Sequence, residues 1–502
     1  MHRNTLSNAE KLKHELENNI GNDLFCRLQP FGYADPLKNP TALLASNMTR
    51  LGLFSKTSAD LLTTCSSSSK LIILDEHLSI LRDFFETRRM DNDLLGKLYN
   101  EMTFPQFLLR LFQKRYKTIY MDGRVVLGRN AEDNLDIHTE LAGKSFIYDI
   151  GTAADTSQLY KEYLTLEETM LSYLVLPQTL SVVTGTGDRS EKGWSIAREF
   201  QTSIDAAVFS YPAAAEFRDG NTTHYDLLFI AKPLGGYLPD ELKQIKHIAE
   251  CPALFNAACK IYGDKFVLND TDVLDHKKDY LHFRSNAVTG GFLLHKHAYL
   301  TRTKHMLKQV LLAAAHDMEK YQLGTTFQLK GLGLGAFSFS AYPHVKQVEA
   351  LFIEALKQVL TETKINYIKQ INLINMPTTF GILKDNIYAE FTKNGIEVVR
   401  SDMNPTTKLH SSKIGVIGGT VFCGDSASMV GNEGNIGMPR GSSDDPATQY
   451  SLLDPNILNA ASNPHLRGEE CLFVMSNNGA MVKLSDYEYQ ANDNKRTLGV
   501  SR

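Results

Sequence analysis

A group of carboxylates follows the apolar run at residues 413–422 and could do chemistry on a sugar. The stretch after this run is polar and rich in glycine, and its acidic residues are Asp425, Glu433, Asp444 and Asp445. Glycine lets backbone N–H groups come close to a ligand, which suits a phosphate. Carboxylates beside Gly and Asn can hold sugar hydroxyls and activate a water molecule. Residues 413–467 are therefore the main candidate for a functional site.

The run at 413–422 must position these groups. A continuous apolar run bounded by glycines predicts a central strand of an α/β sheet, and ligands of such sheets bind just beyond the carboxyl ends of the strands. Asp425 stands where this strand would meet its loop, although an Asp there can also form a turn with its own backbone. Gly431, Asn432 and Glu433 offer polar groups beside a glycine, or an ordinary surface turn.

The segment Ser443-Asp-Asp-Pro-Ala447 also fits the start of a helix, with Asp445 as N-cap and Pro446 at the first helical position. A helix N-terminus beside a loop binds anions, and a capping carboxylate competes with a phosphate there. We therefore expect Asp444 and Asp445 to divide the two roles. A serine nucleophile is disfavoured, because the stretch has no G-x-S-x-G and no neighbouring histidine.

Two further glycine-bearing stretches could contact a ligand. Gly331, Gly333 and Gly335 alternate, so in a strand they would share one face, which either a ligand or a neighbouring backbone can approach. Their spacing is not G-x-G-x-x-G, so a dinucleotide-binding fold is not indicated. The loop at 185–193 contains Asp188 and Arg189 and lacks the G-x-x-x-x-G-K-[ST] pattern of a phosphate-binding loop.

The order of predicted elements indicates an α/β fold with a mostly parallel sheet. The clearest alternation is a strand at 327–339, a helix at 345–361 and strands at 368–375 and 396–399. A hairpin is predicted at 118–127 and a helix at 164–174, with Thr165 as its N-cap. Residues 240–322 read as helical. We predict three regions: a helical N-terminal region at 1–115, a catalytic domain at 116–480 and a polar, frayed tail at 481–502.

The composition excludes several classes of protein. The chain has 502 residues, 43% of them hydrophobic, and a net charge of −4, so the basic surface of a nucleic-acid-binding protein is missing. It has neither a run of roughly 18 apolar residues nor a visible secretory signal. The six cysteines show no CxxC spacing, which fits a reducing compartment. No metal or other cofactor is indicated, because HExxH is absent and the candidate histidines are scattered: His295, His297, His305 and His316.

Taken together, these motifs resemble the macrodomain-like ADP-ribosylhydrolases, of the MavL type, that intracellular bacteria inject into host cells. The resemblance rests on Lys330-Gly-Leu-Gly-Leu-Gly-Ala-Phe337, Gly424-Asp425, Gly431-Asn-Glu433, Ser443-Asp-Asp-Pro-Ala447 and the asparagines from Asn459 to Asn463. Residues 163–172 and the loop Gly187-Asp-Arg189 are also similar to that family. The resemblance covers about 118–470 and leaves the helical N-terminal region outside.

The resemblance implies a macrodomain-like α/β fold, with a mixed, mostly parallel sheet flanked by helices, that binds ADP-ribose. It further implies cleavage of mono-ADP-ribose from a host protein side chain, plausibly arginine, by a secreted effector acting inside the host cell. Acidic residues in the loop after the last sheet strand would be catalytic: Asp425, Asp445 and Asp444. The implied ligand-binding residues are Gly331, Gly333, Gly335, Phe337, Gly424, Gly431, Asn432, Glu433, Asp188 and Arg189.

The sequence departs from the family pattern at three places. Ser426-Ala427 stands where Gly-Asn is expected, Gly434-Asn435 replaces an aromatic pair, and Asp444 replaces a glycine. The last change leaves either Asp444 or Asp445 as the catalytic group. The lost aromatics keep open a reader that binds ADP-ribosylated proteins without cleaving them. A hydrolase of free NAD or of another nucleotide sugar is a third reading.

Overall fold

The structure is a computed structural model and describes a set of segments between residues 67 and 499. These segments are 67–113, 118–119, 125–126, 151–153, 158–161, 164–172, 174–180, 208–212, 230–231, 250–263, 280–283, 292–319, 325–330, 345–374, 395–401, 418–422 and 463–499. All statements about the fold below concern these residues.

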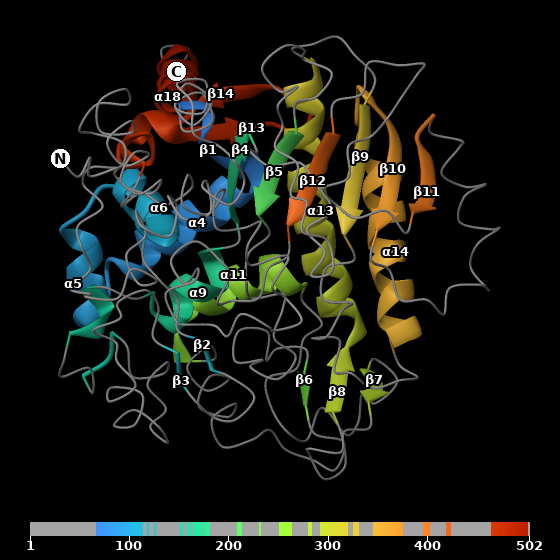
Figure 1. The fold of residues 1–502 in the computed structure, drawn as a ribbon. Helices are drawn as coiled ribbons and strands as arrows, with labels where there is room; N and C mark the ends of the chain where they lie inside the picture. Colours follow the sequence, from blue (N-terminus) through green and yellow to red (C-terminus); the bar gives the residue numbers. More distant parts are fainter. Residues whose placement is uncertain are drawn as a thin grey trace, which may run out of the picture.

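One mixed sheet of nine strands organises the described part of the chain (Figure 1). In spatial order the strands are β11 (Glu397–Ser401), β10 (Ile368–Ile374), β9 (Thr325–Lys330), β12 (Gly418–Phe422), β5 (Val208–Pro212), β4 (Val175–Leu180), β1 (Lys70–Leu74), β13 (Leu472–Met475) and β14 (Met481–Lys483). β12, the described part of the apolar run at 413–422, therefore lies inside the sheet, with β9 on one side and β5 on the other.

The strand directions confirm a mixed, mostly parallel sheet. β11, β10, β9, β12 and β5 form consecutive parallel pairs. β4 is antiparallel to both of its neighbours, β5 and β1, and β14 is antiparallel to β13. Because β1 and β13 are parallel to each other, all strands except β4 and β14 run in the same direction. Their carboxyl ends consequently meet at one edge, which we call the carboxyl edge.

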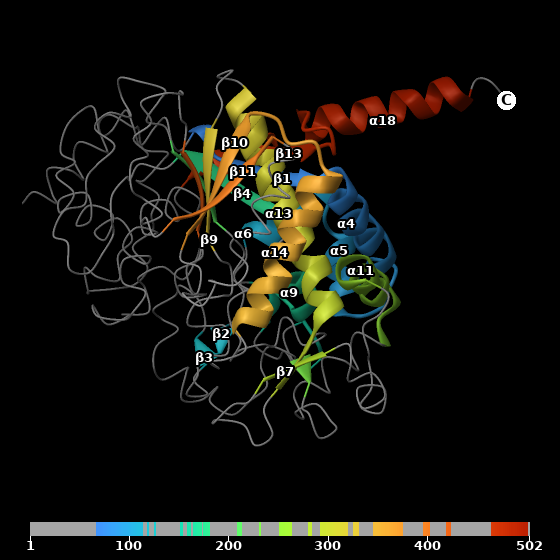
Figure 2. The same cartoon turned by 90° about the vertical axis from the view of Figure 1, so that its right-hand side faces the viewer.

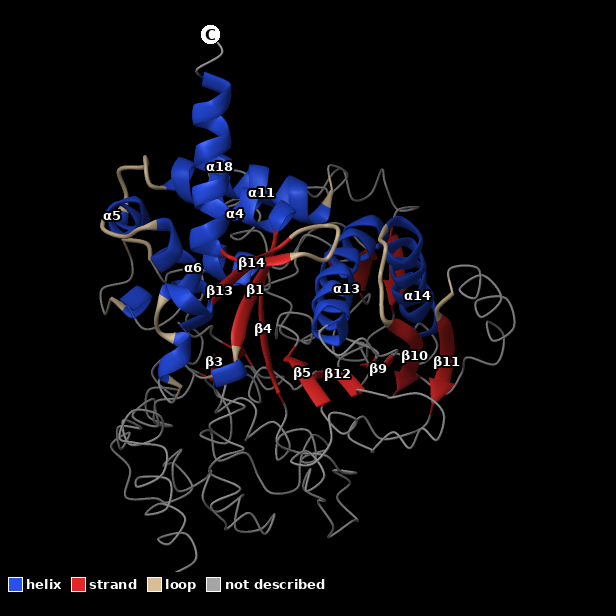
Figure 3. Ribbon diagram, turned by 90° about the horizontal axis from the view of Figure 1, so that it is seen from above, coloured by secondary structure: helices blue, strands red, loops and turns tan. Residues whose placement is uncertain are grey.

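Helices α13 (Lys296–Glu319) and α14 (Val345–Glu362) pack together on one side of the sheet (Figures 2 and 3). α14 forms because its apolar residues recur three and four positions apart, and the buried ones include Val348, Phe352, Leu356 and Val359. α14 connects β9 to β10, which are adjacent and parallel, as expected for a β–α–β unit. The described parts of residues 327–400 confirm the predicted order of strand, helix, strand and strand, while residues 331–344 and 375–394 lie outside the described residues.

A second group of helices packs around β1. α4 (Asp75–Arg88) follows β1 directly and contacts α11 (Pro252–Tyr262), which also contacts α13. The short helices α5 (Leu94–Asn100), α6 (Phe104–Gln113) and α9 (Leu166–Ser172) lie nearby. Aromatic side chains of the core gather here. The ring centroids of neighbouring pairs lie 5.2 to 6.2 Å apart among Phe84, Phe85, Tyr99, Phe104 and Phe107.

The smaller elements lie beyond the carboxyl edge of the sheet (Figure 1). The predicted hairpin at 118–127 is confirmed by β2 (Thr118–Ile119) and β3 (Val125–Val126), which are antiparallel. Strands β6 (Ile230–Ala231), β8 (Phe292–His295) and β7 (Tyr280–Phe283) form a separate antiparallel sheet. β7 and β8 lie within residues 240–322 and correct the prediction that this whole range is helical.

The two ends of the described chain also differ from the sequence prediction. Residues 70–74, predicted as part of a helix, form β1 inside the sheet, where Leu71 to Leu74 are fully buried. Residues 481–499, predicted as a frayed tail, form β14 and α18 (Leu484–Gly499), which projects from the body (Figure 2). β12 is consequently not the last sheet strand, since β13 and β14 follow it in the chain. β1 and β14, which lie outside the predicted catalytic range of 116–480, both belong to the same sheet as the strands within that range.

Candidate functional site

The carboxyl edge brings together the ends of β5, β12 and β9. In the parallel registers, Phe422 of β12 pairs with Pro212 of β5, and Thr420 pairs with Gln328 of β9. Continuing the second register by two residues sets Phe422 level with Lys330, the last residue of β9. Neighbouring strands of a sheet lie about 4.8 Å apart, so the carboxyl ends of β5, β12 and β9 lie close to one another.

Most of the predicted site residues follow the ends of β9 and β12 in the chain, and all of them lie outside the described residues. This holds for the catalytic candidates Asp425, Asp444 and Asp445, and for the ligand-binding candidates Gly331, Gly333, Gly335, Phe337, Gly424, Gly431, Asn432, Glu433, Asp188 and Arg189. Gly331 is the residue after Lys330, and Asp425 is the third residue after Phe422. The glycine stretch and the first acidic stretch therefore start from adjacent strand ends.

The loop with Asp188 and Arg189 starts from a different place. It follows β4, whose antiparallel direction puts its last residue, Leu180, at the opposite edge from the ends of β9 and β12. The strand topology thus groups the glycine stretch after β9 with the acidic stretch after β12.

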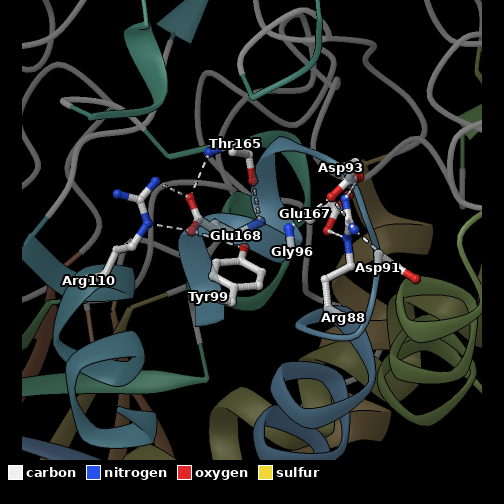
Figure 4. A network of polar contacts seen from close by, with 9 residues as sticks. All are labelled: Arg88, Asp91, Asp93, Gly96, Tyr99, Arg110, Thr165, Glu167 and Glu168. Carbon is white, nitrogen blue, oxygen red and sulfur yellow. Dashed lines mark hydrogen bonds and ion pairs between the residues drawn. The ribbon is translucent and has the colours of Figure 1, made fainter. Parts of the chain in front are cut away.

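A buried polar network lies at the start of α9, next to the carboxyl edge, because α9 leads into the first residues of β4 (Figure 4). Glu168 is completely buried and accepts two hydrogen bonds from Arg110, at 2.5 Å from Nε and 2.9 Å from the terminal nitrogen. It also accepts hydrogen bonds from the Tyr99 hydroxyl at 3.1 Å and from the Thr165 N–H at 3.0 Å. Four donors thus occupy the acceptor sites of this carboxylate.

The second half of the network is centred on Arg88, at the end of α4. Its guanidinium donates to both carboxylate oxygens of Glu167, at 2.9 and 3.2 Å. It also donates to Asp91 at 2.8 Å and to Asp93 at 2.6 and 2.9 Å. Asp93 in turn caps α5 by accepting from the Gly96 N–H at 2.8 Å. The network therefore ties α4, α5, α6 and α9 together.

The electrostatics of the network favour an anchoring role over acid–base chemistry. Burial opposes the charge on Arg88, but hydrogen bonds to Asp93 and the charge of Glu167 outweigh it and raise the Arg88 pKa. The pKa of Arg110 is raised in the same way by Glu168, and burial raises the pKa of Tyr99 well above its usual value. Glu167 and Glu168 are each held by an arginine, so neither is available as a general base at this position.

One part of this network was predicted from the sequence. Thr165 is the N-cap expected for the helix, and its Oγ1 accepts from the Glu168 N–H at 3.2 Å while Glu168 reaches back to the Thr165 N–H. This is the reciprocal capping box signalled by Thr-x-x-Glu. The arginine partners were missed, because Arg88 and Arg110 lie 79 and 58 residues from their glutamates and no local spacing signals them.

A second polar cluster lies where α4 starts against α13. Glu76 and His77 come from the first turn of α4, and His305 comes from the middle of α13. Among the described residues, these three side chains form the group whose ligand atoms are close enough to hold a metal ion.

No helix in the described segments is long and apolar enough to cross a membrane.

Comparison with known proteins identifies the class. A family model described as ADP-ribosylhydrolase MavL-like matches residues 42–490, most of the chain. The chain belongs to this MavL-like ADP-ribosylhydrolase family. The match begins well before the expected range of 118–470, and so includes β1, α4, α5 and α6, which the sequence analysis left outside. No curated protein matches the chain.

Proposed function

We propose that the chain removes mono-ADP-ribose from a modified protein side chain, and that this side chain is an arginine. Membership of the MavL-like ADP-ribosylhydrolase family supports hydrolysis of an ADP-ribose linkage. The proposal goes beyond the family in naming the arginine linkage and the residues that act on it.

One structural observation carries the proposal: β9 and β12 are adjacent and parallel. The glycine stretch that begins at Gly331 and the acidic stretch that contains Asp425 therefore start from the same edge of the sheet. Ligands of α/β sheets bind outside the carboxyl ends of the strands. This topology supports a single pocket in which backbone amides hold the diphosphate and carboxylates act on the distal ribose. Such a pocket is the macrodomain-like arrangement that we propose for this fold.

The proposed reaction breaks the bond between ribose C1″ and a guanidinium nitrogen. Asp445 would orient and deprotonate the attacking water, or Asp444 would do so in its place. Asp425 would bind the ribose hydroxyls or the leaving guanidinium. The transition state has oxocarbenium character, so a carboxylate held nearby stabilises it electrostatically. Water adds its oxygen to C1″, and the guanidine nitrogen keeps the bonding electron pair and takes up a proton.

The experiment that tests this proposal compares substrates with different linkages. Purified chain is incubated with proteins carrying ADP-ribose on arginine, on glutamate or on serine, and with free NAD. Free ADP-ribose is then measured by chromatography. We expect release from the arginine-linked protein and much slower release from the others.

Other outcomes would replace the proposal by a defined alternative. Cleavage of free NAD in preference to the modified proteins would indicate a hydrolase of free nucleotides. Absence of release combined with tight binding of ADP-ribose by calorimetry would indicate a non-catalytic reader. Release from glutamate- or serine-linked protein alone would keep the hydrolase and overturn the arginine linkage.

We further propose that the protein acts inside a host cell as a delivered effector, which rests on the family resemblance alone. A fusion to a reporter enzyme that is active only in host cytosol tests this delivery. A reporter signal that requires the bacterial secretion apparatus is expected, and its absence from infected cells would contradict delivery.

A further inference from the structure

The cluster of Glu76, His77 and His305 joins the start of α4 to the middle of α13. His77 Nε2 and His305 Nδ1 form a hydrogen bond at 3.1 Å, which a metal ion bound to both nitrogens would replace. Glu76 Oε1 lies 4.0 Å from His77 Nε2 and 3.7 Å from His305 Nδ1. Two imidazole nitrogens and one carboxylate oxygen therefore face one another as a triangle. Each is a common ligand of transition-metal ions.

The size of this triangle matches a metal–ligand shell. For sides of 3.1, 3.7 and 4.0 Å, the circle through the three atoms has a radius of about 2.1 Å, close to the bond lengths of Zn²⁺ to imidazole nitrogen and carboxylate oxygen. An ion near the centre would reach all three atoms, and small side-chain movements that shorten the two longer sides would let it leave their plane and take up a fourth ligand.

The lengths of the sides also indicate a low coordination number. At a bond length of about 2.1 Å, neighbouring ligand atoms lie about 3.4 Å apart in a tetrahedral site and about 3.0 Å apart in an octahedral one. All three sides exceed the octahedral value, and two exceed the tetrahedral one. Four-coordinate Zn²⁺ fits this opening better than Mg²⁺, which prefers six oxygen ligands.

Direct hydrogen bonds do not account for the arrangement of the carboxylate. Glu76 Oε1 faces both imidazole nitrogens from 3.7 and 4.0 Å, which is too far for a hydrogen bond. Its other oxygen, Oε2, accepts from the Lys308 ammonium at 2.8 Å. Lys308 therefore orients the carboxylate from outside, as a partner of a ligand often does, although its positive charge opposes a bound cation.

We propose that Glu76, His77 and His305 form a binding site for a divalent transition-metal ion of the zinc class, with a water molecule as the fourth ligand. Such an ion would cross-link α4 to α13 and thereby fix the helix that follows β1. No local spacing of ligands in the sequence signals this site, because His77 and His305 are 228 residues apart.

The test measures zinc binding by the full chain after removal of metal with a chelator. Calorimetry and metal analysis compare the wild type with Glu76→Gln and His305→Asn. The matched control is His316→Asn, on the same helix, whose ring contacts the Gly479 carbonyl instead. We expect one zinc ion whose affinity falls by at least about 100-fold in both ligand variants and is unchanged in the control. A Co²⁺-loaded wild type should give the visible absorption of a four-coordinate ion, which both ligand variants lack.

Two further readouts keep the proposal testable if a ligand variant folds poorly. Zinc should raise the Tm of the wild type, because a ligand that binds only the folded state stabilises it. Lys308→Met should bind zinc more tightly than the wild type, since it removes the opposing charge. The proposal is overturned if the wild type binds no zinc, or if Glu76→Gln and His305→Asn bind it as the control does.

Discussion

Thr420 of β12 and Gln328 of β9 are register partners in adjacent parallel strands. Because both strands run in the same direction, the residues that follow them leave the sheet at the same edge. The glycines beginning at Gly331 and the acidic stretch containing Asp425 belong to parts of the chain separated by α14, β10 and β11. This pairing is the structural basis for assigning both stretches to one pocket.

Removing one partner of the buried ion pair between Arg110 and Glu168 should strongly destabilise the fold. Arg110→Leu would leave the completely buried Glu168 carboxylate without its cation, which typically costs about 3–5 kcal/mol. Denaturant unfolding followed by circular dichroism measures this loss. Arg110→Leu combined with Glu168→Leu should recover much of it, because no charge then remains buried.

The matched control is Lys260→Met, which breaks the exposed ion pair with Asp83. Exposed pairs contribute about 0–1 kcal/mol, so this variant should unfold nearly as the wild type does. Equal losses in Arg110→Leu and Lys260→Met would contradict the anchoring role of the network.

Asp93 should make the fold sensitive to acid. Burial raises the pKa of its carboxyl, but hydrogen bonds from Arg88 and from the Gly96 N–H outweigh burial, so the pKa lies below the ordinary 3.8. The unfolded chain then binds the proton more readily than the folded one. The stabilisation is therefore complete above the ordinary pKa and is lost as the pH falls below it.

Asp93→Asn tests this pH dependence and keeps a residue that can cap α5. The unfolding free energy of this variant, measured between pH 7 and pH 2.5, should fall less on acidification than that of the wild type. If the two curves stay parallel throughout, Asp93 does not contribute to acid unfolding.

Gly96 should not tolerate a side chain, although it lies in a helix. A Cβ at this position would overlap the backbone carbonyl of Asp91, which cannot move independently of the chain. Gly96→Ala should therefore lower the free energy of unfolding by about 1–3 kcal/mol. At Gly468 the added Cβ meets only the flexible end of Glu470, so Gly468→Ala should cost clearly less. Similar losses in the two variants would rule out the backbone overlap as the cause.

The central half of the fold could be predicted because its signals are local. The apolar runs of β10 and β12 and the helical spacing of α14 each appear within a single segment. β1 was taken for a helix because only Asp75, Glu76 and His77 separate its apolar residues from those of α4. Pairing with β13, about 400 residues later in the chain, decides its conformation, as tertiary context often overrides local preference.

The polar composition of residues 481–499 concealed another element. Leu484 is buried, and the Tyr487 hydroxyl donates to Asp75 at the start of α4. These contacts fix the first turns of α18 against distant parts of the chain. In the same way, capping by Thr165 was visible from the sequence, but its Arg110 and Arg88 neighbours were not, because sequence spacing carries no information about such distant pairs.

The most direct test of the proposed pocket is a single-turnover measurement of ADP-ribose release from arginine-modified protein. It compares the wild type with Asp425→Ala, Asp444→Asn and Asp445→Asn, and uses Asp486→Asn, an exposed aspartate of α18, as the matched control. We expect Asp425→Ala and one of the other two site variants to slow release by about 10²- to 10⁴-fold, the usual contribution of general-base catalysis. The slow member of the Asp444 and Asp445 pair should still bind ADP-ribose. Release at wild-type rates by all three site variants would contradict a catalytic site after β12.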